Sequence, residues 1–352
     1  YLQYIFIIKT FIRRTFMSFI NKCSTIIRRS DKEIFKFYID NIIKIDHYDK
    51  DNNLISSNSF DKLNGMDFTN CSFCLNNNDI YGIYKNDGLK MIHIPRGSSI
   101  ISKKDILTYD SKKFDIIFPY INVINNSIHI LYYVYNNNST NTCALFHHYY
   151  NNGVWIENKI DFINHIVLDN FTVLWIQNSP IVFYFNLVNG CEEVFFSRFN
   201  SSTLSWSNPC QITNSNKNKL YLSVLKDSMN FYHLTFCECI DNGYAVKYMN
   251  GYLNENKLDI GTSIYVSGPS TCIYPSLVKQ KSTIYLMWVN YNKLYTSISN
   301  DLGKTWSEHE IDETSIDEDF CRARFLSNYS GDLSYNLTSI FTVNDDITII
   351  GF

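Results

Sequence analysis

The chain has 352 residues, of which 45% are hydrophobic and 16% aromatic, and its formal net charge at pH 7 is -3. This slightly acidic balance argues against binding of nucleic acid through phosphate neutralisation, which requires a basic excess, so we expect no nucleic-acid partner. The wealth of aromatic residues, with only 13 Gly and 6 Pro, favours strands over helices.

The first residues contain no membrane span and no convincing signal peptide. The most apolar run, residues 1–16, is interrupted by Lys9, Arg13 and Arg14 and lacks a small-residue cleavage site. The sequence therefore favours a cytoplasmic location and predicts no transmembrane segment.

Residues 1–60 are predicted to form an N-terminal extension. Ser30 and Glu33 have the spacing of a capping box, and apolar residues then recur three and four positions apart. This pattern predicts an amphipathic helix over about residues 31–44, either packed against the main domain or serving as an interfacial or dimerisation arm.

Ten cysteines are spread along the chain, many of them inside predicted strands. Cys71 and Cys74 form a C-x-x-C pair, but no second pair follows at zinc-site spacing. Buried reduced thiols are therefore expected, and neither a metal nor another cofactor is predicted.

A repeat of about 50 residues organises the chain from about residue 66 onward. Its marker is a strand with an apolar first residue and further apolar residues at its third to fifth positions, and copies of decreasing clarity begin at Ile128, Ile181, Ile284, Ile80, Phe231 and Leu333. Six units at nearly constant spacing indicate a repeat architecture.

Proline and tryptophan residues keep the same phase as this repeat. Pro119 and Pro275 each lie nine residues before the marker strand. Trp155, Trp206 and Trp306 each follow a predicted turn and precede a short strand that ends in Ile. Each unit accommodates four short strands, which is the signature of a propeller blade.

We therefore predict an all-β fold: residues 61–352 form a β-propeller of about six four-stranded blades, with a short helical N-terminal extension. To close the ring, residues 42–47 or 54–60 are expected to add a strand to the last blade. Deleting residues 1–60 should then destabilise the whole propeller.

One short motif supports this assignment. Residues 299–306 match the pattern S-x-D-x-G-x-T-W through Ser299, Asp301, Gly303, Thr305 and Trp306. Asp301 is expected to accept amides of its own turn, Gly303 to adopt positive φ, and Trp306 to pack between blades. The motif resembles the Asp box, or BNR repeat, of sialidase-like propellers. In that family it marks the fold and lies between the third and fourth strands of a blade.

The resemblance also implies a candidate activity. A sialidase-like exo-glycoside hydrolase needs an arginine cluster, a Tyr nucleophile assisted by Glu, and an Asp acid/base. The family's Arg-Ile-Pro motif is absent, and His93-Ile94-Pro95 is its nearest counterpart. Four arginines are spaced across the units and are candidates for a converging cluster: Arg96, Arg198, Arg322 and Arg324. No complete catalytic constellation emerges.

The sequence therefore favours a non-catalytic propeller that recognises a ligand, with a glycan as one candidate. The candidate ligand-binding residues are Tyr120, Trp175, Tyr274 and Arg324. The alternatives are the exo-glycoside hydrolase and a protein-interaction scaffold. Three arginines and a Tyr–Glu pair in one pocket would favour the enzyme, and an apolar rim around an empty channel would favour the scaffold.

Overall fold

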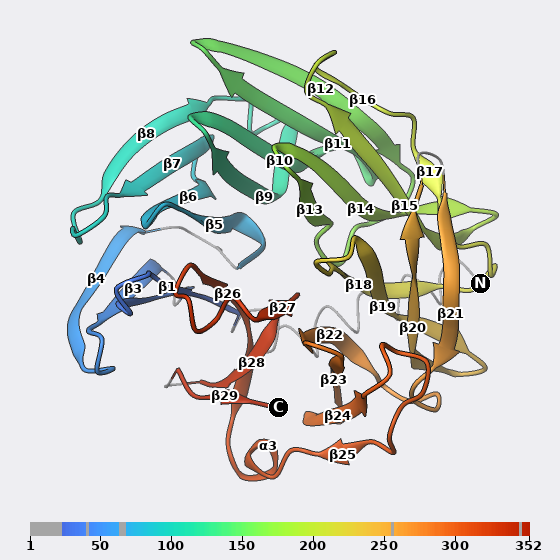
Figure 1. Ribbon diagram of the computed structural model, residues 1–352. Helices are drawn as coiled ribbons and strands as arrows, with labels where there is room; N and C mark the ends of the chain where they lie inside the picture. The colour runs from blue at the N-terminus through green and yellow to red at the C-terminus, as the bar shows by residue number, and fades with distance from the viewer. Residues whose placement is uncertain (1–22, 40–41, 63–67, 255–256, 345–346) are drawn as a thin grey trace.

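The computed structural model describes residues 23–39, 42–62, 68–254, 257–344 and 347–352. These residues form an all-β propeller in which six sheets follow one another around a central axis in chain order (Figure 1). No helix among these residues is both long and apolar enough to cross a membrane. The described helical segments are a single turn at α3 (Thr314–Asp317) and a 3-10 turn at η1 (Phe68–Asn70).

Five of the sheets are antiparallel meanders. Their strands, in chain order, are β5 (Cys71–Asn76), β6 (Asp79–Lys85), β7 (Leu89–Ile94) and β8 (Ser102–Leu107); β9 (Phe114–Ile124), β10 (Ser127–Asn136), β11 (Ser139–Asn151) and β12 (Val154–Ile163); β13 (Thr172–Ile176), β14 (Ser179–Val188), β15 (Cys191–Asn200), β16 (Ser205–Trp206) and β17 (Cys210–Gln211); β18 (Lys219–Lys226), β19 (Phe231–Ile240), β20 (Gly243–Leu253) and β21 (Leu258–Tyr265); and β22 (Ile273–Gln280), β23 (Thr283–Asn290), β24 (Lys293–Ser299) and β25 (Glu310–Ile311), with β27 (Tyr335–Leu337) added beside β22.

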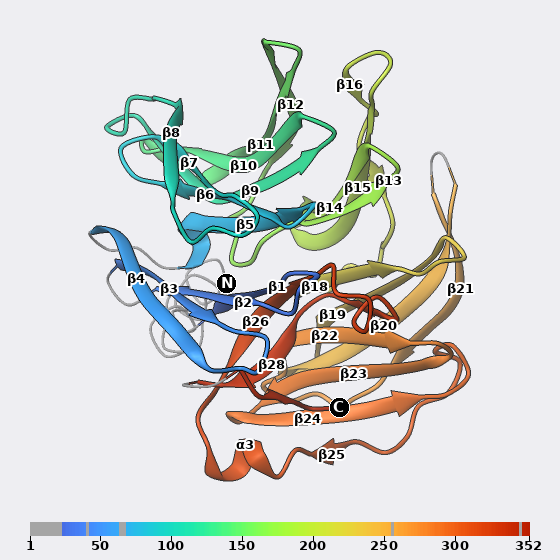
Figure 2. The same cartoon turned by 60° about the vertical axis from the view of Figure 1, so that its left-hand side comes forward.

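The remaining sheet contains both ends of the described chain. A first meander, β1 (Ser24–Arg28), β2 (Ile34–Ile39), β3 (Ile42–Tyr48) and β4 (Leu54–Lys62), joins a last meander, β26 (Phe320–Ser327), β28 (Ile340–Val343) and β29 (Ile349–Ile350). The two meanders meet through parallel pairing of β1 with β26, which run side by side in Figure 2. This pairing closes the ring.

The predicted helix over residues 31–44 is wrong. Ile34–Ile39 and Ile42–Tyr48 are strands, and the capping-box residues form the turn before β2, where Lys32 has φ 75° and the Asp31 carboxylate accepts the Glu33 amide. Ile34, Phe35, Lys36 and Phe37 are all buried, so β2 is covered on both faces. A strand buried on both faces has consecutive apolar residues, and such a run also satisfies helical spacing.

The expected ring closure is correct in principle but assigned to the wrong strand. Residues 42–47 and 54–60 lie in β3 and β4, at the far side of the first meander from β26. The strand that pairs with β26 is β1, with Thr25 opposite Arg324 and Ile27 opposite Leu326.

Five of the six marker strands are the second strands of their sheets: β6, β10, β14, β19 and β23. The copy at Leu333 is wrong, since residues 331–334 form a turn and only Tyr335–Leu337 is strand. The first meander has its own second strand at the marker position, because β2 begins at Ile34, about one period before Ile80.

The turn at residues 299–306 has the expected local geometry. It lies between β24 and β25, the third and fourth strands of the meander β22–β25, and Gly303 has φ 87°. The Asp301 carboxylate accepts the amides of Lys304 (3.0 Å) and Thr305 (2.9 Å) and the Thr305 hydroxyl (2.6 Å). Trp306 packs against Tyr248 of the preceding sheet, with ring centroids 4.9 Å apart.

The phase-marking prolines lie in β-bulges of β9 and β22, the first strands of their meanders. Phe118, before Pro119, and Tyr274, before Pro275, have φ 53° and 52°, and the ladder shifts register at both places. Tyr221 marks a third bulge, with φ 59°. Positive φ is unfavourable for bulky residues, and proline donates nothing to a ladder, so both features interrupt regular pairing. Phe118 and Tyr120, on either side of Pro119, line the pocket at the centre of the propeller.

Candidate functional site

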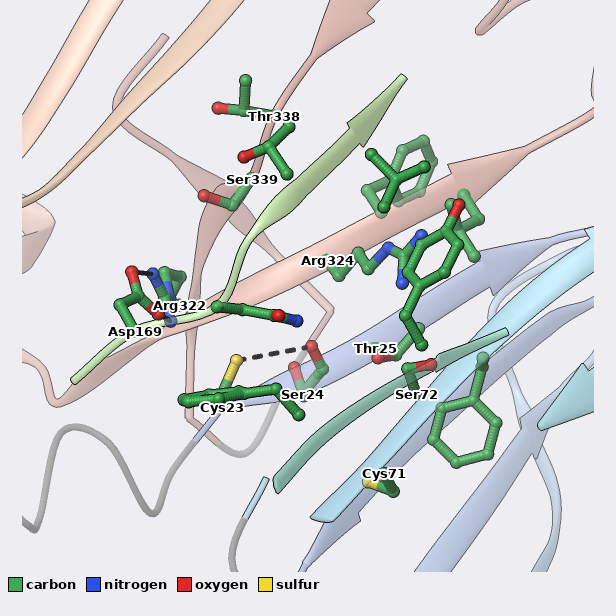
Figure 3. A pocket seen from close by; sticks show the side chains of 18 of the residues that line it. Cys23, Ser24, Thr25, Cys71, Ser72, Asp169, Arg322, Arg324, Thr338 and Ser339 are labelled. Carbon is green, nitrogen blue, oxygen red and sulfur yellow. Dashed lines mark hydrogen bonds and ion pairs between the residues drawn. The ribbon is translucent and has the colours of Figure 1, made fainter. Parts of the chain in front are cut away.

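A cavity of about 290 Å³ lies at the centre of the propeller (Figure 3). Residues of β1, β2, β3, β5, β9, β13, β18, β26 and β27 line it, together with Cys23 and residues 169–171 and 338–339. These strands come from different parts of the ring, so the cavity exists only once the ring has closed. We call it the central pocket.

Strand β26 supplies two arginines to the central pocket. Arg322 and Arg324 are two residues apart and therefore share one face of the strand, while Ala323 between them is fully buried on the other face. Figure 3 shows both side chains extending from this strand. Thr25 of β1 lies opposite Arg324 and also lines the pocket.

Arg322 is neutralised within the protein. Its guanidinium donates to both carboxylate oxygens of Asp169, at 3.2 and 3.3 Å, and its Cζ lies 4.3 Å from the centre of the Tyr274 ring. A two-point arginine–carboxylate pair combines charge with fixed geometry. This pair therefore forms a rigid wall of the pocket.

Arg324 has different surroundings. Its Cζ lies 5.3 Å from the centre of the Tyr120 ring, and no described carboxylate lies within ion-pair distance of it. Tyr120 projects from the Pro119 bulge of β9, and its hydroxyl accepts a hydrogen bond of 3.0 Å from the Trp175 indole. Arg322 and Arg324 with the single Asp169 leave a net charge of about +1 in the pocket lining.

Two polar atoms in the lining have no hydrogen-bond partner among the described residues. They are the hydroxyl oxygen of Ser24, a residue only 5% exposed, and the side-chain oxygen of Asn170. A buried polar atom left without a partner costs free energy, so such atoms are rare. Their position in the lining suits a ligand with donor groups.

Burial sets the protonation of the other reactive groups. It raises the pKa of the Cys23 thiol to about 11, despite the nearby Arg322, so Cys23 is not a thiolate at neutral pH. Burial also raises the pKa of Tyr120, while Arg324 and the Trp175 hydrogen bond act in the opposite direction. Tyr120 is therefore a neutral phenol that can donate a proton.

The four predicted ligand-binding residues fall into two groups. Tyr120 and Arg324 line the central pocket and contact each other. Trp175 lies behind Tyr120 as its hydrogen-bond donor, and Tyr274 lies behind Arg322 as a ring partner; neither is among the lining residues.

The proposed convergence of four arginines does not occur. Arg198 donates to the backbone carbonyl groups of Leu253 and Asn254, away from the pocket. Arg96 follows β7, where its amide and the ring of His93 both bond to Asp79. Among the described residues, two arginines, not three, reach the pocket.

Sequence reasoning missed Asp169 and residues 23–25. Asp169 precedes β13 in an Asp-Asn pair, which reads as an ordinary turn. Residues 23–25 belong to a segment assigned outside the propeller, so their contribution to the pocket depended on the unexpected pairing of β1 with β26.

The lining limits the chemistry that this site can perform. Asp169 is the one carboxylate among the described lining residues, and no described group of three His, Cys, Asp or Glu side chains is arranged to hold a metal. Glycoside hydrolysis by a pair of carboxylates would need a second carboxylate in this lining. The reactive group beside Arg324 is the Tyr120 phenol.

Comparison with known proteins shows a shared fold. No family model matches the sequence, and no curated protein matches it. Among solved structures, an ulvan lyase of polysaccharide lyase family PL25 has 12% identity and a TM-score of 0.61, covering 91% of each chain. An α-L-arabinanase from Penicillium chrysogenum has 9% identity and a TM-score of 0.53, covering 80% of this chain and 94% of that one. The polysaccharide lyase Uly1 has 8% identity and a TM-score of 0.52, covering 79% of each chain.

Proposed function

We propose that this protein is a carbohydrate-active propeller that binds the acidic unit of a glycan in the central pocket. The observation that carries the proposal is Arg324, a half-buried guanidinium in the pocket wall with no described carboxylate partner. A cation that the fold leaves unmatched in a partly buried site favours an anionic ligand.

The chemistry around Arg324 suits a sugar acid. A guanidinium binds a carboxylate or sulfate through two parallel N–H donors. Thr25, Ser24 and Asn170 offer hydroxyl and amide groups for sugar hydroxyls. Tyr120 and Phe171 add aromatic surface for the apolar faces of a sugar ring.

The size of the pocket indicates how much of a glycan enters. At about 290 Å³ it lies near the lower limit of small-molecule pockets, which is about 300 Å³. A terminal unit suits this volume better than an extended stretch of polymer.

We place glycan cleavage ahead of binding without turnover. The solved structures of similar fold described above are glycan-cleaving enzymes by name, and one of the PL25 lyase structures, with a TM-score of 0.62, is bound to a saccharide that contains GlcA. Their low identity supports the fold alone, so the activity rests on the pocket. Sialidase-like hydrolysis has less support, since the described lining of the pocket holds two arginines and a single carboxylate.

Tyr120 is the proposed general acid. As a neutral phenol next to Arg324, it can donate its proton to the oxygen of a leaving sugar while Arg324 holds the acidic group. In an elimination the phenolate so formed takes up the proton alpha to the sugar carboxylate, so that the C–O bond breaks, a C=C bond forms in the acidic unit and Tyr120 regains its proton. Non-catalytic recognition of the same ligand is the second candidate. The Arg324–Tyr120 contact serves both candidates, and cleavage is placed first because a protonated phenol beside the bound acidic group supplies the proton that the oxygen of a leaving sugar needs.

A panel of oligosaccharides tests the proposal. Uronate-, sialate- and sulfate-bearing oligosaccharides and neutral analogues of equal length are titrated by calorimetry, and products are followed by reducing-end release and by the ultraviolet absorbance of unsaturated sugars. We expect acidic saccharides to bind and neutral ones not to bind. Binding with turnover that Tyr120→Phe abolishes supports the enzyme, and binding without turnover supports the second candidate. Equal binding of neutral analogues overturns the proposal.

A further inference from the structure

A row of aromatic and imidazole rings, with two buried histidines between two half-buried tryptophans, leads away from the central pocket behind Tyr120. It consists of Trp175, His129, His147 and Trp206, contributed by β13, β10, β11 and β16. His129 is 2% exposed and His147 is fully buried. We call these four residues the ring row.

The contacts within the ring row are specific. The Trp206 indole donates to His147 Nδ1 at 3.0 Å, and His147 Nε2 lies 3.1 Å from His129 Nδ1. The His129 ring meets the Trp175 ring edge to face, at 4.9 Å and 84°. The Trp175 indole then donates to the Tyr120 hydroxyl at 3.0 Å.

The donors fix the tautomers along the row. An indole N–H only donates, so His147 Nδ1 is an acceptor and the proton of neutral His147 sits on Nε2. His147 Nε2 therefore donates to His129 Nδ1, and the His129 proton sits on its own Nε2. A proton added to either imidazole would place two N–H groups face to face. The row is complete only when both rings are neutral.

The row also fixes the direction of the Tyr120 O–H bond. Since Trp175 donates to the Tyr120 oxygen, the Tyr120 proton must point away from Trp175. Edge-to-face packing against His129 restricts the plane of the Trp175 ring and hence the direction of that donor.

We infer that the ring row positions the Tyr120 hydroxyl, with Trp175 as the direct positioning residue and His129, His147 and Trp206 acting through it. This inference rests on the proposed function, because it assigns these four residues to the use of Tyr120 at the pocket. They touch no ligand themselves; they set the direction in which Tyr120 presents its proton.

Nuclear magnetic resonance of the indole N–H groups tests the row without a ligand. The chain has five tryptophans, so at most five indole signals are expected, and Trp175→Phe and Trp206→Phe assign two of them. Tyr120→Phe removes the acceptor of Trp175, and His129→Phe removes the imidazole while keeping a ring. We expect both variants to shift the Trp175 signal and to speed its exchange with solvent about tenfold, as loss of one hydrogen bond allows.

The signals of Trp155, Trp288 and Trp306 control for folding in these variants. If His129→Phe does not fold, His129→Gln is used, because its amide oxygen still accepts from His147. A Trp175 signal that stays unchanged in a folded His129 variant overturns the inference.

A double-mutant cycle tests whether the row serves Tyr120 or only stability. With the acidic saccharide found above, Trp175→Phe is expected to weaken affinity about three- to tenfold in the wild type and to have no further effect in the Tyr120→Phe background. An equal loss in both backgrounds means a structural role and overturns the inference. If no saccharide binds the wild type, the proposed function fails, while the indole measurement still decides the positioning role.

Discussion

Arg324 lies over the ring of Tyr120, with its guanidinium carbon 5.3 Å from the ring centre. The two residues come from β26 and β9, more than 200 positions apart in the chain, and they meet at the wall of the central pocket. A guanidinium over an aromatic face keeps its charge available along its edge, where the N–H groups lie. The pair thus presents a cation and a phenol to the same space.

The Asp169–Arg322 pair is expected to stabilise the fold. Both side chains are largely buried, so Asp169→Asn leaves an unmatched guanidinium and should lower the free energy of unfolding by about 3 kcal/mol. Urea unfolding measures the change. Asp259→Asn is the matched control, because its pair with Lys257 is exposed and should change stability by less than about 0.5 kcal/mol. Equal effects of the two substitutions would contradict a structural role for the buried pair.

His129 is expected to make the fold sensitive to acid. Burial lowers its pKa to about 4, below the value of about 6.5 for an unfolded histidine. The unfolded chain therefore binds this proton first, so the stability that His129 contributes is complete above about pH 6.5 and is lost as pH falls toward 4. The titratable groups that face His129 are His147 and Tyr149.

The His129 contribution is measured as a difference between proteins. Unfolding free energies of wild type and His129→Gln are compared between pH 7 and 4, so that titrations common to both cancel. The wild type should lose up to about 3 kcal/mol more than the variant over this range. Parallel pH profiles would show that His129 does not titrate as described.

Asp301 is expected to hold its turn and to have no role at the pocket. The Thr305 hydroxyl and amide, followed by further turn donors, lower the pKa of its carboxyl to about 2, so the stabilisation is present at neutral pH and is lost as pH falls from about 4 toward 2. Asp301→Ala should lower the melting temperature by a few degrees while leaving saccharide affinity unchanged. Weaker binding by the variant at temperatures where it is folded would contradict this assignment.

The β1–β26 pairing is expected to carry ring closure. Deleting residues 1–60 removes β1 and exposes the edge of β26, so the melting temperature should fall sharply. Ile27→Ala is a milder test: Ile27 is fully buried, and the substitution should cost about 2–4 kcal/mol. Ile55→Ala, at an exposed position of the same meander, is the control. Unchanged melting of the deletion variant would refute closure by β1.

The propeller was predictable from sequence because its signals are periodic. The marker strands at Ile128, Ile181 and Ile284 repeat at a nearly constant interval, and Pro119 and Pro275 keep the same phase because each occupies a bulge of the first strand of its meander. Strand β2 of the first meander was predicted as a helix because it is buried on both faces and lacks the alternation of a half-buried strand.

The candidate site was predictable only in part. Tyr120 follows a phase marker, and Arg324 interrupts an apolar strand, so both stand out in the sequence. The residues that surround them in the pocket do not stand out in the sequence. Asp169 and Ser24 reach the pocket through closure of the ring, and His129 and His147 form a row through contacts between neighbouring strands and sheets, which no local pattern encodes.

The most direct test of the account is the affinity of Arg324 variants for an acidic oligosaccharide. Isothermal titration compares the wild type with Arg324→Gln, Arg324→Lys and, as a control, Arg96→Gln, which lies outside the pocket. We predict that Arg324→Gln weakens binding about 10- to 100-fold, that Arg324→Lys is intermediate because it keeps the charge but loses the two-point geometry, and that Arg96→Gln has no effect. Wild-type affinity in Arg324→Gln would contradict the assignment of the central pocket as an acidic-glycan site.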